Sequence, residues 1–223
     1  MRLLKPLLAA ELRILPLTEA LTTACLDEEA LTDALFIQEV WPKNLFHNVN
    51  VLGCHFKKCN FAATSLWKAS FLNTVFENCD FSNARWPECR FERVEFRSCK
   101  LLGTDFTAGL WRHVLLEEVN GEYANFTDGG IQTMLINRCE FPNASISDCS
   151  WKSLKLQHCN FTTCEMLHTS LKGIDLRTCQ LSGIKLAGPE LQGAIVTSLQ
   201  AVELARFLGI VIDDTFSDQK ENL

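Results

Sequence analysis

Cysteine is the residue type in this chain with the greatest capacity for chemistry. The chain has 223 residues, of which eleven are cysteine, and Cys79, Cys89 and Cys99 lie ten residues apart between Phe76 and Leu101. Thiolates can ligate zinc, form disulfides or act as nucleophiles. Zinc sites favour close spacings such as CxxC or HxxxH, and the sequence contains neither. A disulfide framework is typical of short secreted chains, whereas this chain is long and its cysteine count is odd.

The remaining candidates for chemistry are scattered. The five histidines fall on different parts of the chain, no GxSxG nucleophile motif or phosphate-binding glycine loop is present, and Glu117-Glu118 is the clearest carboxylate pair. We therefore expect no enzyme, no cofactor and no metal site. Because thiols stay reduced in the cytoplasm, we expect a cytoplasmic location.

A repeat of five residues explains the cysteine spacing. From Phe36 to Val196, 33 consecutive pentads run without a frame slip, and 32 of them have an apolar central residue. Thirteen of the fifteen phenylalanines fall in this phase. The period is neither the 3.6 of a helix nor the 2 of a flat strand.

A second rule governs the position two residues before each centre. It holds Ala, Cys, Gly, Thr or Val in 26 of the 33 pentads, and ten cysteines occupy it: Cys54, Cys59, Cys79, Cys89, Cys99, Cys139, Cys149, Cys159, Cys164 and Cys179. A large and a small residue thus point inward in each pentad. A chain that turns once per pentad and closes after four would stack residues twenty apart, about 4.8 Å from coil to coil. We interpret these cysteines as small core residues; Cys25 lies outside the pattern and stays unassigned.

The pattern resembles that of the pentapeptide-repeat family, in pentads such as CNFAA (59–63), CDFSN (79–83), TDFTA (104–108), ANFTD (124–128) and CNFTT (159–163). The resemblance implies an all-β solenoid, a right-handed quadrilateral β-helix of about eight coils over residues 36–196 with a short C-terminal helical cap. Gly121 is the single pentad centre without a side chain, and we expect a local bulge or a widened coil there, with Tyr123 filling the gap.

The two ends depart from the repeat and predict caps. Residues 1–35 read as an N-terminal cap and lead-in in which Leu26 and Leu31 keep the frame; its first residues resemble a signal peptide only weakly, because Lys5 and Glu11 interrupt the apolar stretch. Residues 199–208 are predicted to be a helix, with Ser198 as N-cap and Gly209 as C-cap. Four apolar residues are expected to cover the last coil (Leu199, Val202, Ala205 and Leu208). Residues 197–213 form the cap and dimerisation segment, and residues 214–223 are predicted to be disordered.

The net charge of the chain limits the classes of partner that it can bind. The formal net charge is −6, which argues against direct binding to nucleic acid or to an anionic membrane. No apolar run is long enough to predict a membrane span. Residues 36–196 carry 16 acidic and 16 basic side chains, so a uniformly acidic rod is excluded.

The family resemblance implies two function hypotheses. The unbroken frame resembles the loopless quinolone-resistance proteins of mycobacteria and Gram-positive bacteria, which are DNA mimics that bind DNA gyrase or topoisomerase IV and protect it from quinolones or a natural-product poison. On that hypothesis the partner-binding residues lie on the face that contains Glu88, Asp105, Asp128, Asp148 and Glu165. The same resemblance implies a homodimer formed through the C-terminal end, with Leu199, Val202, Leu208, Ile210, Val211 and Ile212 at its interface. The alternative is a protein-interaction scaffold with an unknown partner.

Overall fold

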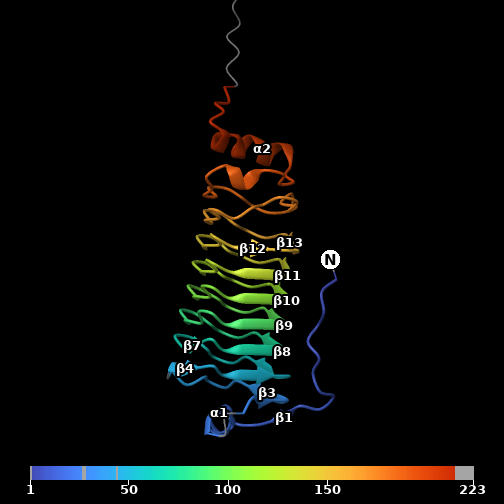
Figure 1. Cartoon of the computed structure of the whole chain (residues 1–223), viewed down its shortest axis with the longest axis vertical. Helices are drawn as coiled ribbons and strands as arrows, with labels where there is room; N and C mark the ends of the chain where they lie inside the picture. The colour runs from blue at the N-terminus through green and yellow to red at the C-terminus, as the bar shows by residue number, and fades with distance from the viewer. Residues whose placement is uncertain (1, 27–28, 44, 214–223) are drawn as a thin grey trace, which may run out of the picture.

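The chain folds into a rod of stacked coils. The computed structural model describes residues 2–26, 29–43 and 45–213, which form a β-solenoid of about seven turns with a short C-terminal helix (Figure 1). The fold class predicted from the five-residue period is thereby confirmed, with a turn number close to the eight expected. The prediction of disorder for residues 214–223 lies outside the described residues.

Parallel pairing between residues twenty apart builds the rod. Phe36 pairs with Phe56, Phe56 with Phe76 and Phe76 with Phe96, so each coil forms hydrogen bonds with the coils before and after it. The main sheet runs in the order β1-β3-β6-β8-β9-β10-β11-β12, with β13 beside β11 and β2 and β5 joining it, while β4 and β7 form a separate pair. The strands are β1 (Arg13–Ile14), β2 (Leu31–Thr32), β3 (Ala34–Ile37), β4 (Leu45–His47), β5 (Asn50–Leu52), β6 (His55–Lys57), β7 (Ser65–Trp67), β8 (Ser70–Glu77), β9 (Arg90–Arg97), β10 (Leu110–Glu117), β11 (Gly130–Asn137), β12 (Ser150–Trp151) and β13 (Leu154–Gln157).

The four sides of the rod are not equivalent. We number them in chain order by their central residues: face 1 contains Phe71, face 2 Phe76, face 3 Phe81 and face 4 Trp86, each with the residues twenty positions away. Strands β8 to β11 each span faces 1 and 2. Faces 3 and 4 are joined largely by isolated bridges, such as Asp80↔Lys100 and Arg85↔Asp105. Two sides of the rod are therefore continuous sheet and two are rows of turns.

Each corner is made by a residue with left-handed backbone. The residue two positions after most pentad centres has a positive φ, as at Asn78 (56°), Asn83 (57°) and Glu88 (56°). At other corners this residue is glycine, as at Gly173 (75°). Most L-residues visit this region rarely, and asparagine and glycine visit it most readily. Because one such residue closes each pentad, the sequence period and the corner geometry are the same feature.

The pentad centres fill the rod with stacked aromatic rings. Phe61 and Phe81 stack with ring centroids 4.7 Å apart and planes 5° from parallel, and Phe91 and Trp111 stack at 4.2 Å. Every apolar centre is buried except four that are partly buried: Phe46, Trp151, Leu191 and Val196. The core assignment from the sequence is confirmed.

The empty centre at Gly121 is filled from the next coil. A Cβ placed on Gly121 would lie 2.3 Å from Cε1 of Phe141, whose ring occupies the space. Tyr123 is 59% exposed, so the expectation that it fills the gap was wrong. Phe141 stands one coil above Gly121, and its ring requires a neighbour without a side chain.

The N-terminal end is closed by a helix and flanked by an extended segment. Helix α1 (Leu17–Leu26) buries Leu17 and Leu21 against the first coil. Because Leu26 belongs to this helix, its predicted role as a pentad centre was wrong, and the frame begins at Leu31, which pairs with Val51. Residues 2–12 run alongside the coils (Figure 1), where the Leu7 N–H donates to Asn73 Oδ1 at 3.2 Å.

The C-terminal end is closed by α2 (Ser198–Leu204), followed by the 3₁₀ helix η2 (Ala205–Leu208) and Gly209 in the left-handed conformation. A further 3₁₀ helix, η1 (Pro189–Leu191), precedes it. The N-cap is Thr197 rather than Ser198: its hydroxyl accepts from Gln200 N, and the Gln200 side chain accepts from Thr197 N. This reciprocal pair is a capping box.

The predicted covering face of the C-terminal helix was wrong. Leu199 is 82% exposed and Leu208 68%, whereas Leu204 is buried and Phe207 packs against the core. Gln200 lies on the same side and donates through Nε2 to the carbonyls of Leu176 and Cys179, at 2.8 Å each. Both carbonyls belong to the last coil. The Leu176 carbonyl also accepts from the Cys179 N–H at 2.9 Å, and Gln200 provides the partner of the Cys179 carbonyl. Hydrogen bonding to carbonyl groups at the end of the solenoid therefore decides which side of the helix faces the last coil.

Candidate functional site

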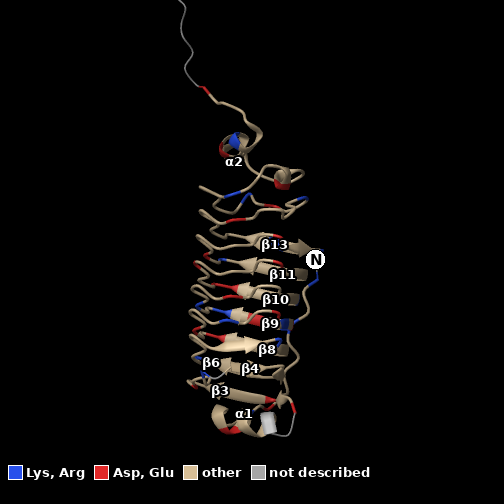
Figure 2. Cartoon of the chain, turned by 60° about the vertical axis from the view of Figure 1, so that its left-hand side comes forward, with Lys and Arg blue, Asp and Glu red and all other residues tan. Residues whose placement is uncertain are grey.

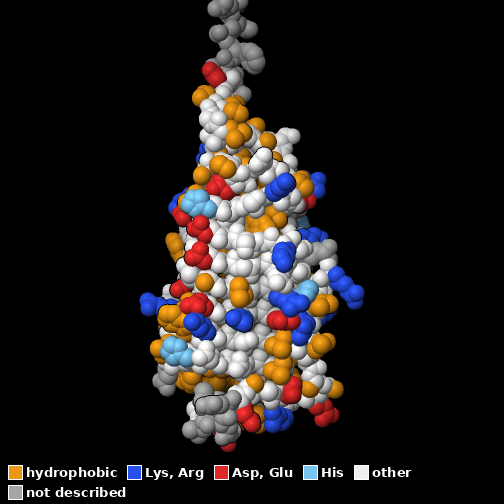
Figure 3. Space-filling view, viewed as in Figure 1, with side chains coloured by type: hydrophobic (Ala, Val, Ile, Leu, Met, Phe, Trp, Pro, Cys, Tyr) orange, Lys and Arg blue, Asp and Glu red, His pale blue; other side chains and the backbone are white. Residues whose placement is uncertain are grey.

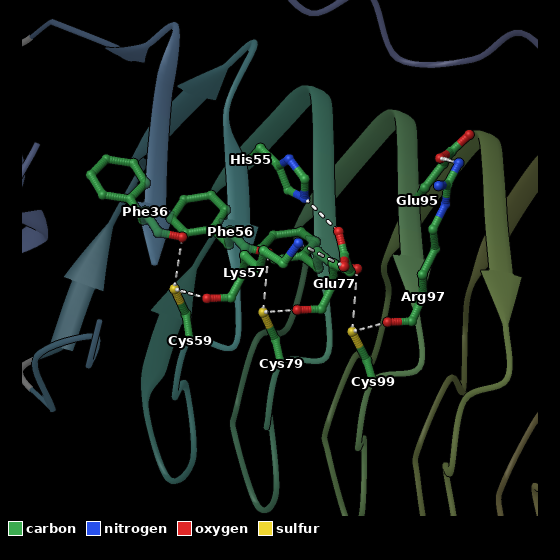
Figure 4. A network of polar contacts seen from close by, with 11 residues as sticks. Phe36, His55, Phe56, Lys57, Cys59, Glu77, Cys79, Glu95, Arg97 and Cys99 are labelled. Atoms are coloured by element: carbon green, nitrogen blue, oxygen red, sulfur yellow. Dashed lines mark hydrogen bonds and ion pairs between the residues drawn. The ribbon is translucent and has the colours of Figure 1, made fainter. Parts of the chain in front are cut away.

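The ten cysteines of the repeat are buried in the wall of the solenoid. The Cys59, Cys79 and Cys99 thiols point the same way on successive coils and donate to the carbonyls of Phe36, Phe56 and Phe76 at 3.3–3.4 Å (Figure 4). Each thiol therefore satisfies a carbonyl of an earlier coil. The prediction that these cysteines are small core residues is confirmed for the ten. The side chain of Cys25 lies outside the described residues.

Burial keeps several of these thiols in their protonated form. It raises the pKa of Cys54 to about 11 and that of Cys89 to about 12. It also raises the pKa of Cys164 far above its ordinary value, and the neighbouring Cys179 thiol together with burial raises that of Cys159. Since the thiolate is the reactive form, these four thiols are poor nucleophiles and poor metal ligands at neutral pH. At Cys179 the hydrogen bond with the Cys159 thiol lowers the pKa instead.

One polar cluster on face 2 brings a histidine beside a carboxylate. His55 Nε2 lies 3.2 Å from Glu77 Oε2, and Lys57 Nζ lies 3.3 Å from Glu77 Oε1 (Figure 4). Burial lowers the pKa of His55 despite the adjacent carboxylate. Within residues 2–26, 29–43 and 45–213, no group of three or more His, Cys, Asp or Glu side chains could hold a metal ion.

The five carboxylates predicted to bind a partner lie on face 4, in two columns. Glu88, Asp128 and Asp148 occupy the corner position, two residues after a centre, with positive φ. Asp105 and Glu165 occupy the position one before a centre, where Asp105 bridges Arg85 and Asn125, and Glu165 bridges Ser145 and Lys185. The structure thus brings all five to one side of the rod, though in two rows rather than a single series.

Several of these carboxylates already have partners. Glu88 pairs with Lys68 at 3.4 Å and Asp148 with His168 Nδ1 at 3.0 Å. Asp105 accepts from the Thr107 N–H at 3.0 Å. Asp128 and Glu165 form no ion pair with any described residue. These last two carboxylates are the ones most available to an incoming cation.

Charge is segregated between the two halves of the rod. Faces 3 and 4 together carry nine acidic and five basic side chains between residues 39 and 188, and faces 1 and 2 carry seven acidic and eleven basic ones between residues 34 and 193. The rod is therefore acidic on one side, by four charges, and basic on the other by four. Figure 2 shows the charged positions on the coils, and Figure 3 shows acidic side chains along the left-hand edge, above β4 and β7.

A family model supports the assignment of the repeat. Residues 49–126 match the model described as a pentapeptide repeat region. Residues 49–126 of this solenoid are a pentapeptide-repeat region. The matched segment covers the coils in which strands β8 and β9 and most of the stacked aromatic rings lie. A search of the curated proteins found no match to the sequence.

Solved structures of pentapeptide-repeat proteins resemble the chain in outline. A trypsin-treated variant of QnrB1, a plasmid-mediated fluoroquinolone resistance protein, is 20% identical, with 82% of this chain and 89% of that chain covered and a TM-score of 0.49. HetL is a pentapeptide-repeat protein of the cyanobacterium Nostoc sp. strain PCC 7120 that is involved in heterocyst differentiation regulation. It is 12% identical, the match covers 82% of this chain and 98% of HetL, and the TM-score is 0.38. Rfr23, from the cyanobacterium Cyanothece 51142, is 14% identical, with 81% and 99% covered and a TM-score of 0.30.

The C-terminal end of the solenoid carries the second predicted site. All six residues predicted to form a dimer interface are exposed in the single chain: Leu199, Val202, Leu208, Ile210, Val211 and Ile212. Val202, Ile210 and Ile212 line a hollow of about 450 Å³ between the cap and the last coils, together with Arg206 and Gly183. Among the described helices, none is long and apolar enough to cross a membrane.

One exposed residue, Trp67, was not predicted from the sequence to belong to a site. Trp67 follows the centre Leu66 directly, and it is the one tryptophan of five that lies outside the pentad phase. Its position out of phase was a signal that it would point away from the core, and its side chain is indeed 42% exposed, on face 4.

Proposed function

We propose that this pentapeptide-repeat protein binds a type II DNA topoisomerase, DNA gyrase or topoisomerase IV, through its acidic side as a partial DNA mimic. On this proposal it protects the enzyme from quinolones or a natural-product poison. The observation that carries the proposal is the segregation of charge, with faces 3 and 4 acidic by four charges and the opposite half basic. A DNA-binding groove is basic, so only the acidic side of the rod complements it.

The charge density makes the mimicry partial. The coils repeat about every 4.8 Å along the rod, and face 4 carries about one carboxylate per coil between Glu88 and Glu165. Double-stranded DNA carries one charge per ~1.7 Å of axis. Binding by this face therefore releases fewer counterions than binding by DNA, and we expect a weaker dependence of affinity on salt.

The alternative function is a scaffold that binds some other protein. The pairing of Glu88 with Lys68 and of Asp148 with His168 favours it, because charges that are already paired attract a cation less strongly. In both proposed functions the protein acts by binding another protein, and the family resemblance does not predict catalysis.

A supercoiling assay separates the two readings. Purified gyrase is inhibited with a fluoroquinolone, the protein is added, and relief of inhibition is measured. In the acidic-side variant, four carboxylates are neutralised (Asp105→Asn, Asp128→Asn, Asp148→Asn and Glu165→Gln). The matched control neutralises four on the opposite face (Glu77→Gln, Glu117→Gln, Glu118→Gln and Asp175→Asn), so that both change the net charge equally. Relief that is lost only in the first variant supports the proposal, and no relief by the unmodified protein rejects it.

We also propose that the protein forms a homodimer through its C-terminal end. The exposed apolar residues of the cap support this, since an apolar patch at the end of a rod is commonly a contact surface. Val211, which is 89% exposed, provides the test. Val211→Glu should convert a dimer into a monomer in light scattering coupled to size exclusion, and a monomeric unmodified protein would reject the proposal.

A further inference from the structure

Trp67 breaks the rule that governs the outward positions of the repeat. Four of the five tryptophans are pentad centres, and three of these, Trp41, Trp86 and Trp111, are fully buried. Trp67 instead points outward from face 4, in a position that holds a small polar residue on three of the later coils (Thr107, Thr127 and Ser147) and proline or leucine on two others (Pro87 and Leu167). A large apolar ring left in water where a small polar side chain would serve is a costly choice for the fold alone.

The indole is held in one orientation by its neighbours. Trp67 Nε1 donates to Glu88 Oε1 at 3.0 Å, across one coil. On the other side the His47 ring lies against it, with centroids 6.3 Å apart and planes 25° from parallel. Leu45, on the strand that pairs with the strand of Trp67, is 59% exposed. Together Leu45, His47 and Trp67 form what we call the Trp67 patch, and Figure 3 shows hydrophobic side chains there, over β4 and β7.

The patch and the acidic columns share face 4. The patch lies on the first coils of this face, and the carboxylates from Asp105 to Glu165 follow on the later coils. Around the patch the charges are balanced in number, because Lys68 pairs with Glu88, and Arg85 lies at the backbone position next to Asp105 of the following coil. Face 4 therefore has an apolar end with little net charge and an acidic end.

A tryptophan fixed by a hydrogen bond is well suited to be an interface anchor. Tryptophan is among the residues that most often dominate binding energy, when its ring enters a pocket and is surrounded by polar contacts. The Glu88 hydrogen bond removes much of the rotamer freedom that binding would otherwise cost. Glu88 thus orients the Trp67 ring, in addition to carrying its own charge.

We propose that the Trp67 patch inserts into an apolar pocket beside a basic surface of the protein partner, while the carboxylates of face 4 pair with that basic surface. This inference rests on the proposed function, and it names the residue on which affinity depends most. The partner is a protein with adjoining apolar and basic regions, since the acidic columns favour a basic surface and the indole requires an apolar pocket.

The test measures binding of gyrase holoenzyme to the full-length protein in a surface-based affinity assay. Trp67→Ala should weaken binding at least tenfold, and Trp67→Phe should retain most of it because the apolar ring is kept. The matched control is Ile37→Ala, which removes a side chain that is also 42% exposed but lies on the opposite face; it should leave binding unchanged. Far-UV circular dichroism checks that each variant folds.

Fluorescence gives a second readout. Trp67 is much more exposed than the buried tryptophans, so acrylamide should quench its emission most readily, and gyrase should protect it from quenching. Gyrase binding that is equal in Trp67→Ala and the unmodified protein would overturn the inference while leaving the proposed function intact. Equal weakening by Trp67→Ala and Ile37→Ala would also overturn it, and so would a Trp67→Phe variant as weak as Trp67→Ala. An unmodified protein that does not bind gyrase overturns both proposals.

Discussion

The pairing of Gly121 with Phe141 gives the sharpest test of the coil packing. In a Gly121→Ala variant the new Cβ would lie 2.3 Å from Cε1 of Phe141, well inside contact distance. Overpacking of this kind costs about 1–3 kcal/mol. For a chain of this size each kcal/mol lowers Tm by roughly 2–4 °C. We therefore expect a clear fall in Tm, measured by circular dichroism.

A double-mutant cycle tells whether Phe141 is the cause. Phe141→Leu alone should destabilise the protein, because it removes ring volume from the core. Combined with Gly121→Ala it should cost less than the two single changes together, with an interaction energy of about 1–2 kcal/mol. Additive effects would mean that the ring does not fill the empty centre, and would refute the explanation of the gap in the repeat.

Three further predictions concern the thiols, the corners and the cap. Since the folded state raises the pKa of Cys54 to about 11 and of Cys89 to about 12 from an ordinary 9.0, the unfolded chain loses these protons first. Stability should therefore be complete below pH 9 and fall as pH rises toward 12, by up to about 1.4 kcal/mol per pH unit for each thiol. Urea unfolding under reducing conditions measures this, and Cys89→Ala should make the fall less steep. Gly173→Ala should cost about 1–2 kcal/mol from the left-handed backbone alone, because nothing lies within 4 Å of the new Cβ; an unchanged Tm would contradict the role assigned to the corner. Thr197→Ala should cost about 0.5–2 kcal/mol by removing the capping box, and its effect on thermal unfolding should exceed that of Ser198→Ala.

The solenoid was predictable from the sequence because one pentad carries all the information for one side of a coil. The large centre and the small residue two before it, as in Phe81 with Cys79, repeat with a phase that no helix or flat strand produces. The same arithmetic placed Glu88, Asp128 and Asp148 on one face, since residues twenty apart must stack.

The ends were less predictable because contacts there are made once and do not repeat. The prediction of which helical face covers the last coil was wrong. Apolar periodicity pointed to Leu199 and Leu208, whereas Gln200 faces the coil and donates to the carbonyls of Leu176 and Cys179. The filling of Gly121 by Phe141 depends on how one ring tilts, which spacing alone does not determine. Trp67 was visible in the sequence as the tryptophan out of phase.

An affinity measurement on the two charge-neutralised proteins tests whether gyrase binds the acidic side of the rod. We predict that neutralising Asp105, Asp128, Asp148 and Glu165 abolishes binding or weakens it at least tenfold at 0.15 M salt. Neutralising the four carboxylates of face 2 should change affinity by less than threefold. Equal affinities for the two variants, or no binding by the unmodified protein, would contradict the account.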